Sequence, residues 1–160
     1  MPANERRNGT NADDLLDSVN RRLLEELQHD ARLTIAELGR RVGLSAPAVA
    51  ERIQRLERDG VIGGYRAQID PRALGLSLTS IIRIRPAPRE LKKVADLARD
   101  TPEVVECQRI TGEDCFFMRV HVRDVGHLEQ VIDRFVAYGQ TTTSIVQSSP
   151  VPARGVALDL

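Results

Sequence analysis

One stretch restricts the fold more than any other, residues 34–59, which read TIAELGRRVGLSAPAVAERIQRLERD. Thr34 followed three residues later by Glu37 is a capping box: the Thr34 hydroxyl accepts from the Glu37 N–H, and the Glu37 carboxylate reaches back to the Thr34 N–H. Gly43 stands where a left-handed residue ends a helix, because glycine has no Cβ to clash there. The apolar positions between them share one stripe at helical spacing: Ile35, Leu38 and Val42. The spacing predicts a short amphipathic helix of about two turns.

A second helix is predicted directly after the first. Ser45 is placed to be its N-cap, and Pro47 lies in the first turn, where a missing N–H costs no intrahelical hydrogen bond. The apolar residues face inward: Val49, Ile53 and Leu56. The opposite face carries small or polar residues: Pro47, Ala48, Glu51, Arg52, Arg55 and Arg58. Two short helices joined by a tight turn form a helix-turn-helix, whose usual partner is double-stranded DNA.

Two helices this short cannot bury their own apolar stripes, so neighbouring segments are expected to complete the core. Upstream, apolar residues recur at helical spacing as far as His29 and Asp30: Leu16, Val19, Leu23, Leu24 and Leu27. Downstream, residues 60–65 read GVIGGY and suggest a short strand or wing. The sequence therefore predicts a three-helix, winged helix-turn-helix domain over residues 13–66, after a disordered tail over residues 1–12.

The formal net charge of the chain is +0, but its distribution is uneven. Between Arg32 and Arg66 seven arginines stand against four acids, which gives this stretch a net charge of +3. Phosphate binding responds to such a local field, and one copy with so little charge should bind weakly. Two copies on a dimer would bind an inverted repeat together. We predict DNA contacts from these residues: Thr34, Arg40, Arg41, Ser45, Ala46, Pro47, Ala48, Glu51, Arg52 and Arg55.

These predicted contacts divide by chemistry. Ser45 and the N–H groups that begin the second helix suit phosphate, and Arg40 and Arg41 suit the DNA backbone. The residues expected nearest the base edges lie on the outward face of the second helix: Ala48, Glu51, Arg52 and Arg55. The alternative reading of the arginines is that they are solvated helix charges.

The second half alternates strand-like and helix-like segments. Residues 76–85 alternate and are rich in β-branched side chains, and Pro86 and Pro88 end this strand. A helix from Leu91 to about Thr101 follows. The remaining elements are predicted in this order: strands over 104–110 and 116–123, a helix over 125–138, and a strand over 141–148. The inward residues of the later helix are Leu128, Val131, Ile132, Phe135 and Val136.

The order βαββαβ indicates a ferredoxin-like, ACT-like domain over residues 76–149. A linker over 67–75 precedes this domain, and a tail over 150–160 follows it. The predicted fold class is α+β, with both helices on one face of a four-stranded sheet. Apolar residues stand on both faces, as with Ile81 beside Ile82, so a second copy is expected to cover the open face. We therefore predict a homodimer. Four arginines lie on the predicted strands, and we interpret them as solvated or paired across strands with Glu106: Arg83, Arg85, Arg119 and Arg123.

Composition restricts the class of protein. With 41% hydrophobic and 29% charged residues and no apolar run of roughly 18 residues, the chain is typical of a soluble protein. The polar start has no hydrophobic segment of the signal-peptide kind, so a cytoplasmic location and no membrane partner are expected. Cys107 and Cys115 lack a CxxC partner and are interpreted as buried or half-buried free thiols, with a redox switch as the minor alternative. His29, His121 and His127 show no ligand spacing, so no metal and no cofactor are predicted.

From about Leu16 to Ser149 the chain resembles the leucine-responsive and asparagine-responsive regulators, the Lrp/AsnC family. The segments that carry the likeness are Leu16-Asp17 to Asn20-Arg21, Leu24 to Asp30, Ala36-Glu37-Leu38, Arg41-Val42-Gly43-Leu44-Ser45, Glu51 to Glu57, Gly60-Val61-Ile62 and Tyr65. The resemblance implies a bacterial or archaeal transcription factor with an N-terminal DNA-binding domain and a C-terminal effector and oligomerisation domain. It also implies dimers that group into tetramers or octamers, tuned by small molecules that are most often amino acids.

The same resemblance places an effector loop between the second and third strands of the C-terminal domain, in a pattern like Gly-Asp-x-Asp-Tyr. This sequence has Gly112-Glu113-Asp114-Cys115-Phe116, which keeps the glycine and an acid but has a cysteine in place of the second acid. The implied effector residues are Thr111, Gly112, Glu113, Asp114 and Cys115. Glu113 or Asp114 suits an α-ammonium group, and the N–H groups of the turn suit a carboxylate. A solvated hairpin loop is the alternative.

Two other functions stay open from the sequence. Decarboxylases of sirohaem-type tetrapyrroles resemble this family in both domains, but they need histidine and arginine around a large pocket and no functional reading helix. Here the basic helix is present and histidines are few, so the sequence favours a regulator and predicts no enzyme. A stand-alone amino-acid sensor would leave residues 34–59 without a purpose. The DNA sequence, activation or repression, the effector, and four or eight chains are left open.

Overall fold

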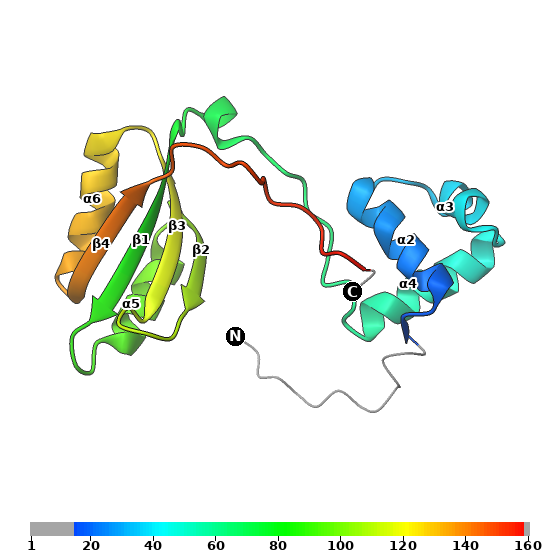
Figure 1. Cartoon of the computed structure of the whole chain (residues 1–160), viewed down its shortest axis with the longest axis horizontal. Coiled ribbons are helices and arrows are strands. Elements are labelled where there is room, and N and C mark those ends of the chain that lie inside the picture. The colour runs from blue at the N-terminus through cyan, green and yellow to red at the C-terminus, as the bar shows by residue number, and fades with distance from the viewer. Residues whose placement is uncertain (1–14, 159–160) are drawn as a thin grey trace. The chain divides into compact units, whose positions relative to one another are not determined.

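The computed structural model describes residues 15–158, so the predicted tail over 1–12 and the last two residues lie outside the described part. The chain forms two compact units, and Figure 1 shows the three helices of the first and the sheet with its helices of the second. Among the described residues, the first unit contains those up to Ala67 and also residues 153–158, and the second is Gln68–Pro152. The C-terminal residues thus return to the N-terminal unit, whereas the sequence predicted only a tail there.

The first unit is built from three helices: α2 (Ser18–His29), α3 (Ile35–Val42) and α4 (Ala46–Arg58). As predicted, the Thr34 side chain caps α3 by accepting from the Glu37 N–H at 3.1 Å, and Gly43 ends it with a φ of 74°. Their apolar stripes meet in one core: Leu23, Leu27, Leu38, Val49 and Ile53. The helix-turn-helix is therefore confirmed, with the upstream helix completing its core.

Two local predictions for this unit are wrong. The Glu37 carboxylate does not reach back to Thr34, because it pairs with Arg40 and Arg41 instead. Residues 60–70 form neither helix nor strand, so the expected wing strand is missing. A strand needs a neighbour that completes its hydrogen bonds, and the described part of this unit offers none. The segment is tied to α4 by the Tyr65 hydroxyl, which donates to Glu57 at 2.9 Å; desolvation and this bond raise the pKa of Tyr65 to about 12.

The C-terminal residues lie along α2. The Gln28 side-chain amide donates to the carbonyl of Val156 at 3.2 Å, and the Arg21 guanidinium donates to the carbonyl of Leu158. Gly155 lies so close to the Gln28 side chain that a Cβ there would force this side chain to move. Both hydrogen bonds are accepted by backbone carbonyls, so they fix the backbone of residues 156–158 against α2 and do not depend on the side chains of these residues. Residues 153–158 therefore form part of the helical unit.

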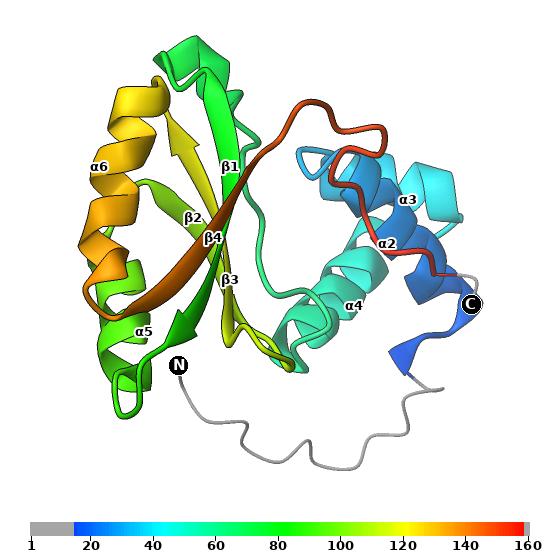
Figure 2. The same ribbon diagram turned by 60° about the vertical axis from the view of Figure 1, so that its left-hand side comes forward.

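The second unit has the predicted βαββαβ order. Its elements are β1 (Leu78–Pro86), α5 (Leu91–Asp100), β2 (Val104–Arg109), β3 (Phe116–Val122), α6 (Val125–Val136) and β4 (Gly139–Ile145), after a 3-10 turn at Pro71–Leu74. The strands are antiparallel in the order β2-β3-β1-β4, which confirms the ferredoxin-like arrangement. Figure 2 shows α5 and α6 on the same face of this sheet.

The core of the second unit lies between the sheet and its two helices. Every second residue of β3 is buried there, from Phe116 to Val122, because alternate side chains of a strand point to opposite faces. Leu128, Val131 and Phe135 of α6 pack against them as predicted. Val136 does not, because it is 49% exposed at the last residue of the helix.

Within the second unit, the other face of the sheet is covered by neither α5 nor α6. The cross-strand register brings Ile81 opposite Arg119 and Arg83 opposite Phe117 on this face. The Arg119 Nε donates to Glu106 at 3.1 Å, as the sequence predicted for one of the strand arginines. The face therefore mixes half-buried apolar residues with ion pairs. No helix within residues 15–158 is both long and apolar enough to cross a membrane.

Candidate functional site

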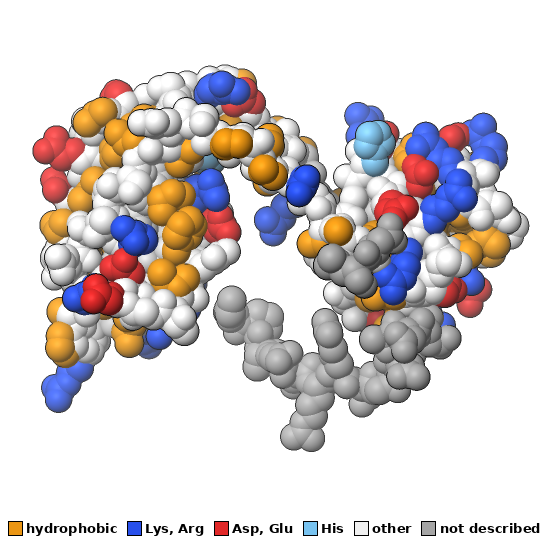
Figure 3. Space-filling model, viewed as in Figure 1, with side chains coloured by type: hydrophobic (Ala, Val, Ile, Leu, Met, Phe, Trp, Pro, Cys, Tyr) orange, Lys and Arg blue, Asp and Glu red, His pale blue; other side chains and the backbone are white. Residues whose placement is uncertain are grey.

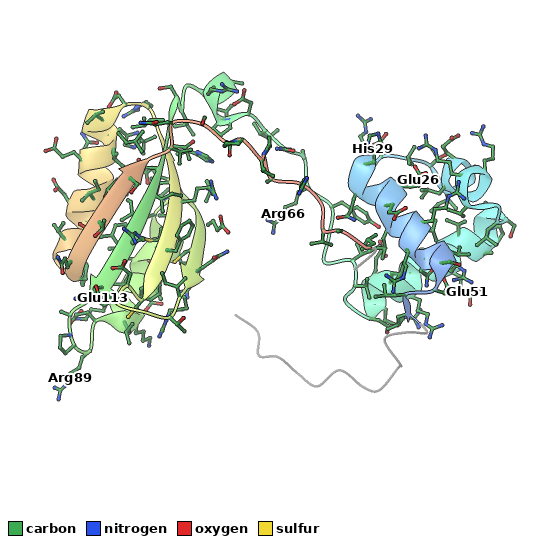
Figure 4. All side chains as sticks on the ribbon, in the orientation of Figure 1. Glu26, His29, Glu51, Arg66, Arg89 and Glu113 are labelled. Atoms are coloured by element: carbon green, nitrogen blue, oxygen red, sulfur yellow. The ribbon has the colours of Figure 1, made fainter. Side chains whose placement is uncertain are left out.

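The second helix of the helix-turn-helix presents its outward residues as predicted. Glu51, labelled in Figure 4, and Arg55 are exposed, whereas Val49 and Leu56 on the inner side are fully buried. Ser45 has the extended backbone of an N-cap, but its hydroxyl makes no capping hydrogen bond. The first turn of α4 also includes the exposed residues Ala46 and Pro47. The start of α4 is thus a solvent-facing surface with a hydroxyl and the unpaired N–H groups that begin any helix.

The arginines of α3 are paired with acids. Arg40 pairs with Glu37, and Arg41 pairs with Glu26 of α2 at 2.6 Å and with Glu37 at 3.2 Å. The bonds to Glu26 and Glu37 raise the pKa of Arg41 above its usual range. Figure 3 shows basic and acidic side chains intermixed over α2 and α3. Exposed pairs of this kind are weak, because water competes for both partners, so a phosphate group can replace the acid.

Arg52 differs from the other predicted DNA contacts. Its guanidinium donates to the Asp17 carboxylate at 2.7 Å and to the Asn20 side-chain oxygen at 3.0 Å, both at the start of α2. The Arg52 side chain is 35% exposed, and Asn20 is buried. The helical spacing of α4 predicted Arg52 on the outward face with Glu51 and Arg55. The partners on α2 are far away in the chain, so this spacing could not identify them.

The predicted effector loop is a hairpin between β2 and β3. The Ile110 N–H donates to the Cys115 carbonyl at 3.0 Å, and the Cys115 N–H donates to the carbonyl of Ile84 on β1 at 2.8 Å. Gly112 has a φ of 114°, a conformation that residues with a Cβ rarely adopt. Thr111, Gly112 and Glu113 are exposed, and Asp114 and Cys115 are half-buried. The five predicted residues are thus one continuous turn attached to the end of β1.

Both acids of this loop have arginine partners on β1. Asp114 pairs with Arg83 at 3.5 Å, and Glu113, labelled in Figure 4, pairs with Arg85. Arg85 also donates to the Glu113 carbonyl at 3.0 Å. The two acids differ in exposure, since the Asp114 side chain is 22% exposed and that of Glu113 is 86% exposed. Arg83 and Arg85 are therefore part of the candidate site. The alternation of residues 76–85 places them on the open face, but it does not identify their partners.

The other candidate groups have structural partners. The His127 Nδ1 accepts from the Arg123 N–H, so its Nε2 carries the proton and donates to Glu103 at 3.0 Å. No group of three or more histidines, cysteines or acids among the described residues is arranged to hold a metal ion. Cys115 is half-buried as predicted, but Cys107 is exposed, which the sequence did not predict. Neighbouring protein groups still displace part of the water around the Cys107 thiol, and this desolvation raises its pKa. A raised pKa lowers the fraction of reactive thiolate, which weakens the redox alternative for Cys107.

Comparison with known proteins gives a consistent result for both units. Residues 16–57 match the AsnC-type helix-turn-helix domain, and residues 79–156 match the Lrp/AsnC ligand binding domain. A curated relative, the uncharacterised HTH-type transcriptional regulator YezC of Bacillus subtilis, is 40% identical over 84% of this chain and 95% of its own. The chain belongs to the Lrp/AsnC family.

Solved structures of Lrp/AsnC proteins have the same fold. A feast or famine regulatory protein from M. tuberculosis in complex with L-methionine is 33% identical, covers 88% of this chain and 98% of its own, and superposes with a TM-score of 0.82. A transcriptional regulator of Neisseria meningitidis, also in complex with L-methionine, is 27% identical over 90% and 97% of the two chains, with a TM-score of 0.83.

Membership in the Lrp/AsnC family assigns roles to the two units. The helical unit is a DNA-binding domain, the sheet unit is a ligand-binding domain, and the protein is a transcriptional regulator. This outcome confirms the regulator predicted from the helix-turn-helix and the βαββαβ order. The curated relatives are regulators too, so the comparisons do not favour the tetrapyrrole decarboxylase.

Proposed function

We propose that this Lrp/AsnC protein acts in the cytoplasm as a homodimer that binds an inverted-repeat DNA site through α4 of each copy. The observation that carries the proposal is the start of α4, where the Ser45 hydroxyl makes no capping bond and the first residues are exposed. Such a helix end attracts phosphate through its N–H groups and its dipole. One helix with few unpaired arginines binds weakly, and two copies add their contacts.

The proposed DNA contacts keep the division of roles that the sequence predicts. Thr34, Arg40 and Arg41 lie at and along α3 and contact the backbone, exchanging Glu37 and Glu26 for phosphate. Ser45, Ala46 and Pro47 contact phosphate at the start of α4. Ala48, Glu51 and Arg55 approach base edges. Arg52 is treated separately below, because its partners on α2 bear on its role.

We further propose that an amino acid binds at residues 111–115 and changes assembly or DNA affinity. The ligand-binding domain and the L-methionine complexes of two related regulators support this class of ligand. The α-ammonium group would take the place of Arg83 beside Asp114, and the N–H groups of the turn would receive the carboxylate. Asp114 is better placed than Glu113 because it is less exposed and its charge is less screened by water.

Dimerisation through the open face of the sheet is part of the same proposal. Ile81 and Phe117 are half-buried on the face of the sheet that α5 and α6 leave uncovered. The sheet of a second copy would bury these two side chains. The ion pairs of Arg119 and Arg83 would then lie at the rim of the interface or form salt bridges with the second copy. The dimers would then group into tetramers or octamers. Light scattering at micromolar concentration tests this step, and a monomer would contradict it.

The deciding experiment is a mobility-shift titration of the full chain on its own upstream intergenic DNA and on random DNA, at several salt concentrations. We expect preference for one sequence and a steep salt slope, because each phosphate contact adds about 0.9 to the slope. Arg41→Ala should weaken all sequences alike and lower the slope by about one. Equal affinity for both DNAs at every salt concentration would contradict specific binding to this DNA.

The effector part is tested by repeating the titration with a mixture of the twenty amino acids. A change in affinity or in assembly is expected, and Asp114→Asn should remove it while leaving DNA binding without effector unchanged. Glu113→Gln is the matched control, and its response should stay close to that of the wild type. If both variants respond as the wild type does, the loop is not the ligand site.

A further inference from the structure

A polar network joins the start of α2 to the middle of α4. The Asp17 carboxylate caps α2 by accepting from the Asn20 N–H at 2.7 Å, and its second oxygen accepts from Arg52 at 2.7 Å. The Asn20 side chain accepts from Arg52 at 3.0 Å and donates to the Leu15 carbonyl at 3.0 Å. Arg52 thus holds the capping residue and the first turn of α2 at the same time.

The position of Arg52 on α4 separates it from the outward residues. It follows Val49 by three positions and precedes Leu56 by four, and both of these side chains are fully buried. Arg52 therefore stands at the edge of the packed stripe, facing α2. Glu51 and Arg55, four residues apart, stand together on the exposed side. Arg52 thus faces α2, whereas Arg55 lies on the exposed side and pairs with Asp59 at 3.8 Å.

We propose that Arg52 is a positioning residue for DNA recognition: held by Asp17 and Asn20, it sets the orientation of α4, while Glu51 and Arg55 read the bases. This proposal rests on the proposed reading of DNA by α4. Asp17 and Asn20 lie outside α4, and by holding Arg52 they contribute to the affinity for DNA. Arg52 can join both groups because its Nη1 carries two N–H donors, and this one nitrogen donates to Asp17 and to Asn20.

Burial of Asn20 makes the loss of its partner costly. Asn20 is 4% exposed, so removing the Arg52 guanidinium takes away the hydrogen bond that its side-chain oxygen accepts in a largely buried position. Partial burial alone would raise the pKa of Asp17, but the Asn20 N–H and the Arg52 guanidinium outweigh it and lower that pKa. Asp17 is therefore ionised at neutral pH and holds the arginine by charge as well as by hydrogen bonds.

The test compares full-length variants on DNA that the wild type selects from a random pool, with every position of that site then changed in turn. Arg52→Ala and Asp17→Ala should each weaken binding to all sites by about tenfold and keep the order of base preferences, and the double variant should be no weaker than either. Arg52→Lys, which keeps a cation for Asp17, should recover part of the affinity. Arg55→Ala should instead flatten the preference at one position.

Folding is controlled by making every measurement at a temperature where circular dichroism shows the variants to be fully folded. A role in stability alone predicts wild-type affinity there, and that result would overturn the proposal. Loss of preference at one base pair in Arg52→Ala, or additive losses in the double variant, would also overturn it. If the wild type selects no sequence, specific DNA recognition by α4 is itself contradicted. This outcome differs from the results above, which would contradict only the positioning role of Arg52.

Discussion

Thr34 and Ser45 occupy the same position at the starts of α3 and α4, yet only the Thr34 hydroxyl caps its helix. Thr34→Ala should therefore lower the free energy of unfolding of the helical unit by about 1 kcal/mol, the usual cost of losing a capping bond. Ser45→Ala is the matched control and should leave stability nearly unchanged. Thermal unfolding followed by circular dichroism measures both, and equal losses would contradict the assignment.

Arg89 has a φ of 74°, a left-handed conformation that is strained for a residue with a Cβ. It is the third residue of a turn closed by the Glu90 N–H and the Ala87 carbonyl at 3.0 Å, where glycine is usual. Arg89→Gly should stabilise the protein by about 0.5–1 kcal/mol, because relief of strain exceeds the added chain entropy. Denaturant unfolding tests this, with Arg89→Ala as a control that should bring no gain.

Residue-scale prediction from sequence succeeded only in part where neighbours in the chain decide the outcome, because the Glu37 carboxylate does not return to Thr34 and the Ser45 hydroxyl does not cap α4. The Thr34 cap and the left-handed Gly43 depend on contacts three or four residues away. The partners of Arg52 on α2 and of Asp114 on β1 are 35 and 31 positions away, and folding alone brings them together. The position of a charged residue on a helix or strand shows which face it lies on, but it does not identify the distant residue that pairs with it.

The start of α6 is joined to the loop before β2 by one cluster. Glu103 accepts from His127 at 3.0 Å and pairs with Arg134 at 3.3 Å, and the His127 bond, which contributes most, lowers the pKa of Glu103. A carboxyl whose pKa is lower in the folded state stabilises the fold above its ordinary pKa of 4.5, and this contribution is lost as the pH falls through the lowered value. The cluster therefore stabilises the packing of α6 against the segment before β2 at neutral pH and loses this effect in acid.

Glu103→Gln should lower the free energy of unfolding of the sheet unit by about 1–2 kcal/mol at pH 7. The difference from the wild type should shrink in acid, where the wild-type carboxyl also becomes neutral. Chemical unfolding at a series of pH values measures it. Glu129→Gln, at an exposed position of α6, is the control and should show neither effect. A loss that is the same at every pH would contradict the charged role of Glu103.

Element-scale prediction was accurate because each helix and strand of the sheet unit has its own periodic pattern. β3 was expected over 116–123 and spans Phe116–Val122, and α5 was expected to close near Thr101 and ends at Asp100. The exceptions were β4, which was expected over 141–148 and spans Gly139–Ile145, and the wing. Residues 60–65 carry strand-like residues, but a strand is stable only with a hydrogen-bonded neighbour, and composition does not show whether one exists.

At the scale of the whole chain, the return of residues 153–158 to α2 leads to a prediction. A chain that ends at Pro152 should lose the bonds that Arg21 and Gln28 make to the tail, and the helical unit should become less stable by about 1 kcal/mol. Hydrogen exchange should then be faster in α2 and unchanged in the strands of the second unit. Arg22→Ala, on the same helix but without a described contact to the tail, should leave α2 protected.

Because synthesis runs from the N-terminus, the contact of residues 153–158 with α2 forms late. The ribosome releases α2, α3 and α4 first, and these helices pack before the sheet unit has been synthesised. The residues that lie on α2 leave the ribosome only after the whole of that sheet unit. A nascent chain thus carries a reading domain that lacks its last segment, and the segment arrives when the ligand-binding domain has been completed.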